Sequence, residues 1–205
     1  MLFRQFTQIS ESHCGPAVLQ MLLDAIGISA SQADIARAAG AEQTIDQDGT
    51  RVDQLALACS RIAPQTQFWY KYHSSLDDIR YLLSRGYIIG VEWQGLFYES
   101  EEEEDDDDHG HYSVISHLDE ERQAFIIVDP YKDFSNQSRI FEVATFLRRW
   151  WDTNDIPDPI TGRKKLVEDV RLLFFITPLG EFFPPERNFK PFSSLDLGNW
   201  YQPTH

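Results

Sequence analysis

Cys14 stands between a polar loop and a stretch with helical spacing, where a cysteine can serve as a nucleophile. Apolar side chains recur three or four positions apart over residues 17–26, which predicts a helix that starts near Gly15-Pro16. A thiol at a helix start lies near unpaired backbone amides and the positive end of the helix dipole, and both favour the thiolate. The alternative interpretation is a small residue that merely begins a helix. Cys59 is expected within a helix among apolar neighbours, which is typical of a structural cysteine.

A predicted β-hairpin carries a second group of chemically active side chains. Strand patterns over Tyr112–His117 and Ala124–Val128 are joined by a polar turn, which we centre near Glu120. Continued outward, the register that follows places His111 directly opposite Asp129. Directly opposed side chains have Cβ atoms roughly 4.5–5.5 Å apart on one face of a sheet. The sequence therefore predicts contact between this imidazole and this carboxylate.

A histidine held by a carboxylate can act as a general base, because the carboxylate fixes one ring nitrogen and leaves the other to take a proton. With Cys14 added, His111 and Asp129 give the nucleophile, base and orienting acid of a triad. A register shift of one residue would undo the pairing. The alternative is that Gly110-His111 and Asp129-Pro130 only shape the ends of two strands.

The remaining patterns predict the elements that position these residues. Further helices are expected over Ser31–Gly40, Thr50–Cys59, Ser75–Ser84 and Val143–Trp151, and further strands over Gln67–Tyr72, Gly86–Trp93, Ser138–Phe141 and Val170–Ile176. Helices come first and strands second, which indicates one α+β domain with an antiparallel sheet over residues 1–178. Residues 179–205 show neither period and are predicted to form an extended C-terminal tail packed on the domain.

Length, charge and cysteine content exclude several classes of function. The 205 residues suit one domain, and a net charge of −15 without a basic stripe argues against nucleic-acid and anionic membrane partners. The 2 cysteines exclude a disulfide framework and a four-cysteine zinc site. The N-terminus lacks the pattern of a signal peptide, and no stretch approaches the ~18 apolar residues of a spanning helix. We therefore expect a soluble, cytoplasmic protein.

Much of the negative charge is concentrated in one run. Nine acidic residues fall within Glu99–Asp108, which ends three residues before His111, and without them the net charge of −15 becomes −6. Most runs of this kind are solvated and disordered, which is one interpretation. The other is that the run attracts cationic substrates to the rim of a cleft. In that case Glu101 and Asp108, together with Gly110 beside the histidine, are candidate substrate-binding residues.

Four short motifs follow one another in the chain. They are Gln8, Cys14–Ala17 (CGPA), Gly110–Val114 (GHYSV) and Val128–Tyr131 (VDPY). This combination resembles the C39-like cysteine peptidases of the papain-like superfamily, from about Thr7 to Trp151. The fold that the resemblance implies is papain-like, with an N-terminal helical half packed on a C-terminal antiparallel sheet or half-barrel.

The resemblance also implies a role for each matching residue. Cys14 would be the nucleophile, His111 the general base and acid, and Asp129 the residue that orients the imidazole. Gln8 would help the Cys14 backbone amide to form an oxyanion hole.

This sequence departs from the family pattern in several places. Exporter-linked members carry the domain ahead of transmembrane and ATP-binding parts, which are absent here, so coupling to peptide export is not expected. The residue before the nucleophile is commonly acidic in that group, whereas here it is His13. We interpret His13 as an exposed loop histidine rather than as a second basic group that favours thiolate. The acidic run is not part of the family pattern either.

Metal sites are the competing interpretation of some of these residues. His109 and His111 with Cys14 could hold zinc, since histidines two apart on a strand share a face. The acidic run could bind calcium, but it lacks the alternating ligands and the glycine of a Ca²⁺ loop. We expect neither a metal nor a cofactor.

The favoured hypothesis is a cysteine hydrolase, most simply a peptidase, that cleaves a peptide or a small amide through an acyl-enzyme on Cys14. A preference for basic substrates would follow from the acidic run. Two alternatives stay open, an acyl or aminoacyl transferase on the same scaffold and a non-catalytic papain-like binding module. Neither the substrate nor the oligomeric state follows from the sequence.

Overall fold

The chain begins with a helical half. The computed structural model describes residues 3–95, 110–157, 161 and 163–194. The first helices are α1 (Cys14–Ala25), α2 (Gln32–Ala39), α3 (Ile45–Asp48) and α4 (Val52–Ile62). The predicted caps of α2 are present, because the Ser31 side chain accepts a hydrogen bond from the Asp34 amide and Gly40 has a left-handed φ of 74°. Among the described residues, no helix is long and apolar enough to cross a membrane.

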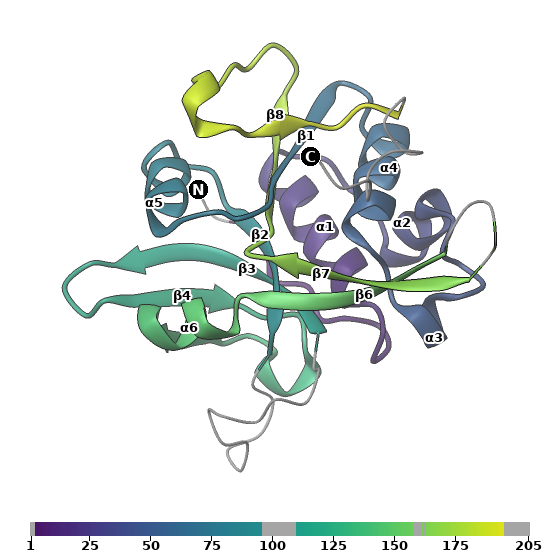
Figure 1. Ribbon diagram of the computed structural model, residues 1–205, viewed down its shortest axis with the longest axis horizontal. Helices are drawn as coiled ribbons and strands as arrows, with labels where there is room; N and C mark the ends of the chain where they lie inside the picture. Colours follow the sequence, from purple (N-terminus) through teal and green to yellow (C-terminus); the bar gives the residue numbers. More distant parts are fainter. Residues whose placement is uncertain (1–2, 96–109, 158–160, 162, 195–205) are drawn as a thin grey trace.

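The second half is an antiparallel sheet with strand order β5-β4-β3-β2-β8-β1-β9. Its strands are β1 (Thr66–Lys71), β2 (Ile89–Gln94), β3 (Gly110–Asp119), β4 (Ala124–Val128), β5 (Ser138–Glu142), β8 (Leu173–Pro178) and β9 (Lys190–Pro191). Two helices, α5 (Leu76–Ser84) and α6 (Val143–Arg149), lie between strands in the sequence. In Figure 1 α1 lies in the centre with α2, α3 and α4 to its right, and the β3–β4 hairpin extends to the left. The predicted combination of a helical half and an antiparallel sheet is confirmed.

Strand β8 separates two hydrophobic cores. Successive side chains of a strand point to opposite faces, and Phe174 accordingly packs in the core with α1, α2 and α4 while Phe175 packs in the core with α5 and α6. Both rings are fully buried, which explains the unbroken apolar sequence of this strand. On β2, Gly90 has no side chain because a Cβ there would meet the Phe174 ring. The central strands are therefore held rigidly from both sides.

A second, two-stranded sheet was not predicted. It consists of β6 (Trp151–Pro157) and β7 (Lys164–Val170), which pair with each other in an antiparallel hairpin. The prediction of helix up to Trp151 is wrong, because α6 ends at Arg149, and the last strand of the large sheet begins at Leu173 rather than at Val170. The sequence does not predict this hairpin, because two of its buried side chains, Asp152 and Asp169, are acidic and its strands show no apolar alternation.

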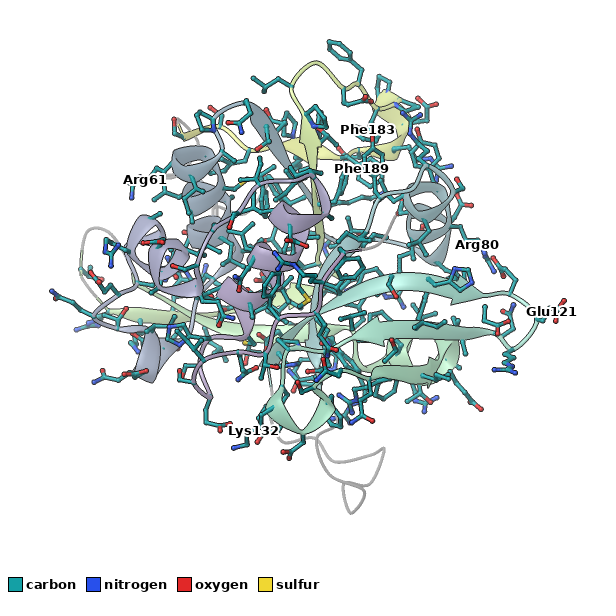
Figure 2. The ribbon with its side chains drawn as sticks, turned by 180° about the vertical axis from the view of Figure 1, so that it is seen from behind. Arg61, Arg80, Glu121, Lys132, Phe183 and Phe189 are labelled. Carbon is teal, nitrogen blue, oxygen red and sulfur yellow. The ribbon has the colours of Figure 1, made fainter. Side chains whose placement is uncertain are left out.

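The segment after β8 returns to the domain. A short 3-10 helix, η2 (Pro185–Arg187), leads into β9, and the Phe189 and Phe192 side chains are buried in the two cores. Phe183 and Phe189 lie together in Figure 2, with ring centroids 5.4 Å apart. The boundary at residue 178 stays a prediction. Residues 195–205 and the acidic run, with its candidates Glu101 and Asp108, lie outside the described residues.

Candidate active site

Cys14 is the first residue of α1. Its thiol is unbridged and partly exposed. The next residue must be glycine, because a Cβ on Gly15 would collide with the Thr50 Oγ1 atom just before α4. The helix start can therefore lie directly against the chain that leads into α4. A helix start leaves its first amides without partners inside the helix, so the thiol lies beside groups that can donate to an anion.

His111 is the second residue of β3 and is almost completely buried, with 3% of its surface exposed. It pairs with Trp93 of β2, a fully buried residue that keeps this end of the strand in place. The imidazole Nε2 lies 2.9 Å from Asp129 Oδ1. The Cys14 thiol makes a side-chain hydrogen bond with the same ring. Because Nε2 is held by the carboxylate, Nδ1 is the ring nitrogen available to the thiol.

Asp129 is fully buried directly after β4, and both of its carboxylate oxygens are used. Oδ1 accepts the bond from His111 and a second one, of 2.9 Å, from the Tyr131 amide. Oδ2 accepts from Arg139 Nη1 at 2.7 Å and from Ser113 Oγ at 3.4 Å. The carboxylate is therefore fixed from several directions before any substrate arrives.

The charges of this group support one another. Burial disfavours the imidazolium, but the charge and hydrogen bond of Asp129, together with Cys14, raise the pKa of His111 to about 10. Burial likewise disfavours the carboxylate, yet His111 and Arg139 lower the pKa of Asp129 to about 2. At neutral pH the histidine is therefore an imidazolium paired with a carboxylate.

The predicted register of the hairpin is wrong, although His111 and Asp129 are in contact. The strands pair Val114 with Val128, and an irregularity between Ile115 and His117 shifts the ladder near the turn. Continued outward, this register places Asp129 opposite Ser113 and makes His111 its diagonal neighbour. Diagonal side chains are still within reach when one of them is long. The bulge and the turn, in which Gln123 has a positive φ of 50°, account for the two-residue shift.

The side-chain amide of Gln8 is already engaged in hydrogen bonds. Its Nε2 donates to the carbonyl oxygens of Ser10 (2.9 Å) and Glu11 (3.0 Å), and its Oε1 is buried without a hydrogen-bond partner. Its backbone amide donates to Pro130 O at 2.8 Å, which ties the loop before α1 to the end of the hairpin. The role of Gln8 in an oxyanion hole stays a prediction, and it requires the amide to release one of these carbonyls.

The interpretation of His13 as an exposed residue is wrong. Only 9% of its surface is exposed, and its Nδ1 lies 2.6 Å from Ser10 Oγ. Burial lowers the pKa of His13 below its ordinary value, although nearby Asp46 opposes the shift. The imidazole is therefore neutral at neutral pH and packs as part of the loop that leads to Cys14.

Gly110 is exposed and has an evident structural reason to lack a side chain. A Cβ at this position would collide with the carboxylate of Asp152 from β6. The β6–β7 hairpin thus approaches the residue directly before His111. The role of Gly110 in substrate binding stays a prediction.

Asp152 belongs to a buried carboxyl cluster that sequence reasoning missed. We define this cluster as Glu92, Asp152 and Asp169, which are 1%, 6% and 1% exposed. Asn154 Nδ2 donates to Glu92 Oε1 (3.3 Å) and to Asp169 Oδ2 (3.1 Å). Gln94 Nε2 donates to Asp152 Oδ1 at 3.1 Å. The only sequence signal is one acidic residue within the apolar strand β2.

The carboxyl cluster is electrostatically strained. Burial, followed by repulsion from Asp152 and Asp169, raises the pKa of Glu92 well above its ordinary value. Burial also raises the pKa of Asp169 to about 7. Within the described residues no group of three or more His, Cys, Asp or Glu side chains has the arrangement of a metal site. The raised pKa values of Glu92 and Asp169 favour protonated carboxyl groups in this cluster, beside the amide donors of Asn154 and Gln94.

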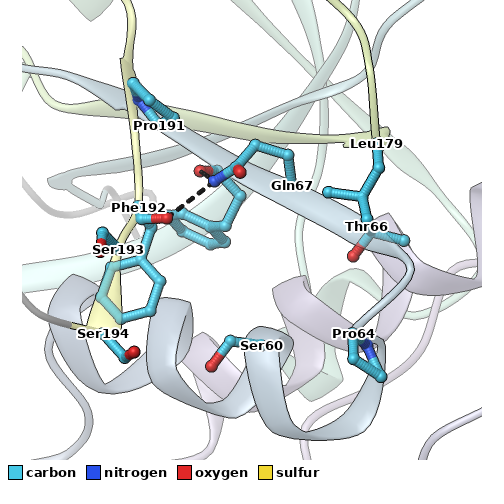
Figure 3. Close-up of a pocket in the computed structure, with 10 residues that line it drawn as sticks. Ser60, Pro64, Thr66, Gln67, Leu179, Pro191, Phe192, Ser193 and Ser194 are labelled. Carbon is cyan, nitrogen blue, oxygen red and sulfur yellow. Dashed lines mark hydrogen bonds between the residues drawn. The ribbon is translucent and has the colours of Figure 1, made fainter.

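A hollow of about 480 Å³ lies elsewhere, between the end of α4 and strands β1 and β9. Figure 3 shows Ser60 and Pro64 on one side and Gln67 with Pro191 on the other. None of the candidate catalytic residues lines it.

Comparison with known proteins adds an independent line of information. The sequence model of the Peptidase_C39 like family matches residues 2–156, well over half of the chain. The match contains Gln8, Cys14, His111 and Asp129. No curated protein sequence matches this chain.

Solved structures with the same fold are also found. The peptidase domain of Streptococcus ComA, a bifunctional ABC transporter involved in quorum sensing, has a TM-score of 0.58 at 18% identity, covering 86% of this chain and 99% of that domain. A Bacillus anthracis protein described as a C39-like peptidase has a TM-score of 0.59 at 14% identity, covering 85% and 94%. A double-glycine motif protease of an AMS/PCAT transporter was solved in complex with the leader peptide. It has a TM-score of 0.53 at 15% identity, covering 86% of this chain and 92% of that chain. Identities this low show a shared fold.

Proposed function

The chain belongs to the C39-like peptidase family, and on this premise we propose that it is a cysteine peptidase that forms an acyl-enzyme on Cys14. The observation that carries the proposal is the buried imidazole of His111, which is held by Asp129 on one side and hydrogen-bonded to the thiol on the other. A nucleophile, a base and an oriented third group in mutual contact are what covalent acyl transfer requires.

Because His111 is an imidazolium at neutral pH, the reaction begins from the form of the site in which the Cys14 proton already resides on Nδ1 of His111. The resulting thiolate attacks the substrate carbonyl carbon, and the electron pair of the C=O bond moves to oxygen. The imidazolium then gives its proton to the leaving amine as the C–N bond breaks. Asp129 stays ionised throughout, in line with its pKa of about 2, and stabilises the imidazolium through the 2.9 Å contact with Nε2. Water, deprotonated by the neutral imidazole, then hydrolyses the thioester.

The negative oxygen formed during attack requires donors that are already oriented. The backbone amide of Cys14, at the start of α1, is the first candidate donor. The Gln8 side chain is the second, and in the absence of substrate it donates to the carbonyls of Ser10 and Glu11 instead. Exchange of one carbonyl for the oxyanion would make this interaction specific to the reacting complex.

Peptides are the proposed substrate class. The related protease of the AMS/PCAT transporter was solved in complex with a leader peptide. The partial exposure of Cys14 and the exposure of Gly110 support access of an extended chain to the Cys14–His111 pair.

Acylation tests the proposal directly. The protein is mixed with a peptide p-nitrophenyl ester, and the adduct is located and timed by intact and peptide mass spectrometry. We expect an acyl group on Cys14 that appears and is then lost to water, and we expect adduct formation at least about 100-fold slower in His111→Ala. Cys59→Ala is the matched control, because that buried thiol has a pKa raised to about 11 and should contribute nothing.

Acylation at Cys59 as fast as at Cys14, or an unchanged rate in His111→Ala, would contradict the proposal. A stable adduct that leaves only when an amine is added would indicate a transferase in place of a hydrolase.

A further inference from the structure

Arg139 holds the side of Asp129 that faces away from the histidine. It comes from β5, where it pairs with Ile127 of β4. Its Nη1 donates to Asp129 Oδ2 at 2.7 Å, and the two side chains are 12% and 0% exposed. A pair this well buried is barely screened by solvent, so the guanidinium contributes strongly to the electrostatics of the carboxylate.

The guanidinium is also fixed in position by two aromatic rings. Its central carbon lies 3.8 Å from the centroid of the Phe134 ring and 4.6 Å from that of Phe141. Cations placed over aromatic faces are attracted by the ring quadrupole, and the stacked planes limit rotation of the fork. The arrangement is therefore a built part of the interior and not a surface ion pair.

The two oxygens of Asp129 consequently have separate duties. Oδ2 accepts the hydrogen bond from Arg139, and Oδ1 accepts those from His111 and from the Tyr131 amide. A carboxylate without the guanidinium could rotate and would attract the imidazolium with its full charge. With the guanidinium present, the plane of the carboxylate is fixed and the proton of the imidazolium is held less tightly. A general acid must release its proton to the leaving group, so this balance matters for turnover.

We propose that Arg139 is a positioning residue of the Cys14–His111–Asp129 site, which aims Asp129 Oδ1 at the imidazole and sets the pH range in which the thiol and imidazole react. The inference rests on the proposed function of this site. Among the residues that the structure describes, the titratable and charged groups around Asp129 are His111 from β3, Arg139 from β5 and, through the imidazole, Cys14 from α1. Arg139 does not touch the reacting atoms and acts through Asp129.

The sign of the effect follows from charge alone. Loss of a positive charge makes each nearby deprotonation less favourable, so both the pH at which Cys14 becomes reactive and the pH at which His111 loses its proton rise. For a unit charge at the distance of one intervening carboxylate, an effective dielectric constant of about 20 gives a shift of about one pH unit.

The experiment is the pH profile of Cys14 alkylation by iodoacetamide, which needs no substrate, read by peptide mass spectrometry from pH 4 to 12. In Arg139→Gln both midpoints should move upward by about one unit. In Arg139→Lys, which keeps the charge, they should stay within about 0.3 unit of the wild-type values. If the Gln variant does not fold, Arg139→Met removes the same charge and retains an unbranched side chain between the rings.

Arg80→Gln is the matched control. Arg80 donates to Glu120 at 2.6 Å near the tip of the β3–β4 hairpin, and Figure 2 shows it beside the hairpin end that carries Glu121, on the other side of the molecule from Lys132, which follows Asp129 by three residues in the chain. Its removal changes the net charge equally and should leave both midpoints in place. Unshifted midpoints in Arg139→Gln, or equal shifts in Arg80→Gln, would overturn the inference. If wild-type Cys14 shows no His111-dependent reactivity at all, the proposed function itself fails.

Discussion

Asp129 and Asp169 are both buried aspartates of the β-sheet half, but their surroundings are opposite. Asp129 faces two cationic side chains, His111 and Arg139, and accepts a bond from a backbone amide. Asp169 faces Glu92, another carboxyl group, and is supported by the amide of Asn154. The pKa of Asp129 falls to about 2, whereas that of Asp169 rises to about 7. Burial of one residue type therefore leads to a permanent anion in one place and to a shared proton in the other.

The two arrangements are close neighbours on β3. Gly110 lies against the Asp152 carboxylate of the acidic cluster, and the next residue, His111, lies against Asp129. Two adjacent residues of one strand thus contact two different environments. At His111 the carboxylate charge is balanced by cationic side chains, and at Gly110 the carboxyl groups repel one another. A buried acidic residue therefore marks a functional candidate only together with its partners, because burial alone raises a carboxyl pKa in both clusters.

Replacement of aspartate by asparagine should show the largest difference between the two sites, Asp129 and Asp169. Asp129→Asn removes the charge that supports the imidazolium, so kcat/KM for an acyl donor should fall about 10²–10⁴-fold. The free energy of unfolding should also fall by about 2–4 kcal/mol, because Arg139 stays buried without its carboxylate. Steady-state kinetics and urea unfolding measure the two effects.

Asp169→Asn is the matched control for that experiment. Its activity should stay within about threefold of the wild-type value, and its stability at pH 8 should be equal or higher, because an amide replaces a group that is costly to ionise in this position. Comparable losses of activity in both variants would show that the two clusters do not differ in function.

The pH dependence of stability should show the next largest difference. A raised folded-state pKa, as for Asp169, gives stability that is fully present below the unfolded pKa of 3.8 and is lost as the pH rises to about 7. The lowered pKa of Asp129 acts in the opposite direction, since its contribution is present above 3.8 and is lost as the pH falls towards about 2. Urea unfolding between pH 4 and 8 should therefore show a decline that is about 2–4 kcal/mol smaller in Asp169→Asn than in the wild type, because Glu92 and His111, whose pKa values are also raised, contribute to the decline in both proteins. Parallel curves for the two proteins would contradict the assignment of the shared proton.

Local signals explain which parts of this structure could be predicted. Ser31 and Gly40 bound α2 by cap chemistry that involves only neighbouring residues, and α1 follows from apolar spacing. The contact between His111 and Asp129 was also predicted, but for an imperfect reason: the turn lies further along the chain than assumed, since Asp119 pairs with Ala124, and the bulge near Ser116 reduces the resulting shift by one residue. A bulge depends on the backbone conformation of a few residues and leaves no sign in the apolar alternation.

Contacts between distant segments explain what was missed. Arg139 stands ten residues after Asp129, and its role depends on the return of β5 along β4 and on Phe134 and Phe141. The strands β6 and β7 were overlooked because Asp152 and Asp169 occupy buried positions where an apolar residue is expected. These residues are polar, and their burial depends on partners contributed by other strands, which the sequence alone does not reveal.

The smallest expected effect concerns the acidic run Glu99–Asp108, which ends close to His111 in the sequence. Up to nine negative charges near the site act over about one Debye length, roughly 8 Å at physiological salt. We predict that they concentrate substrates with Lys, Arg or a free ammonium group, so replacement of the nine acids by Ser and Gly should lower kcat/KM for basic peptides about 2–10-fold. For neutral peptides kcat/KM should be unchanged or slightly higher after the replacement, because the run also raises the energy of the Cys14 thiolate.

The difference in kcat/KM between basic and neutral peptides should fade at 0.5 M NaCl, which separates a long-range field from direct contacts of Glu101 or Asp108 with the substrate. Equal responses of basic and acidic peptides to the replacement would remove the run from substrate selection and leave the ion pair of Asp129 with His111 as the site's main electrostatic feature.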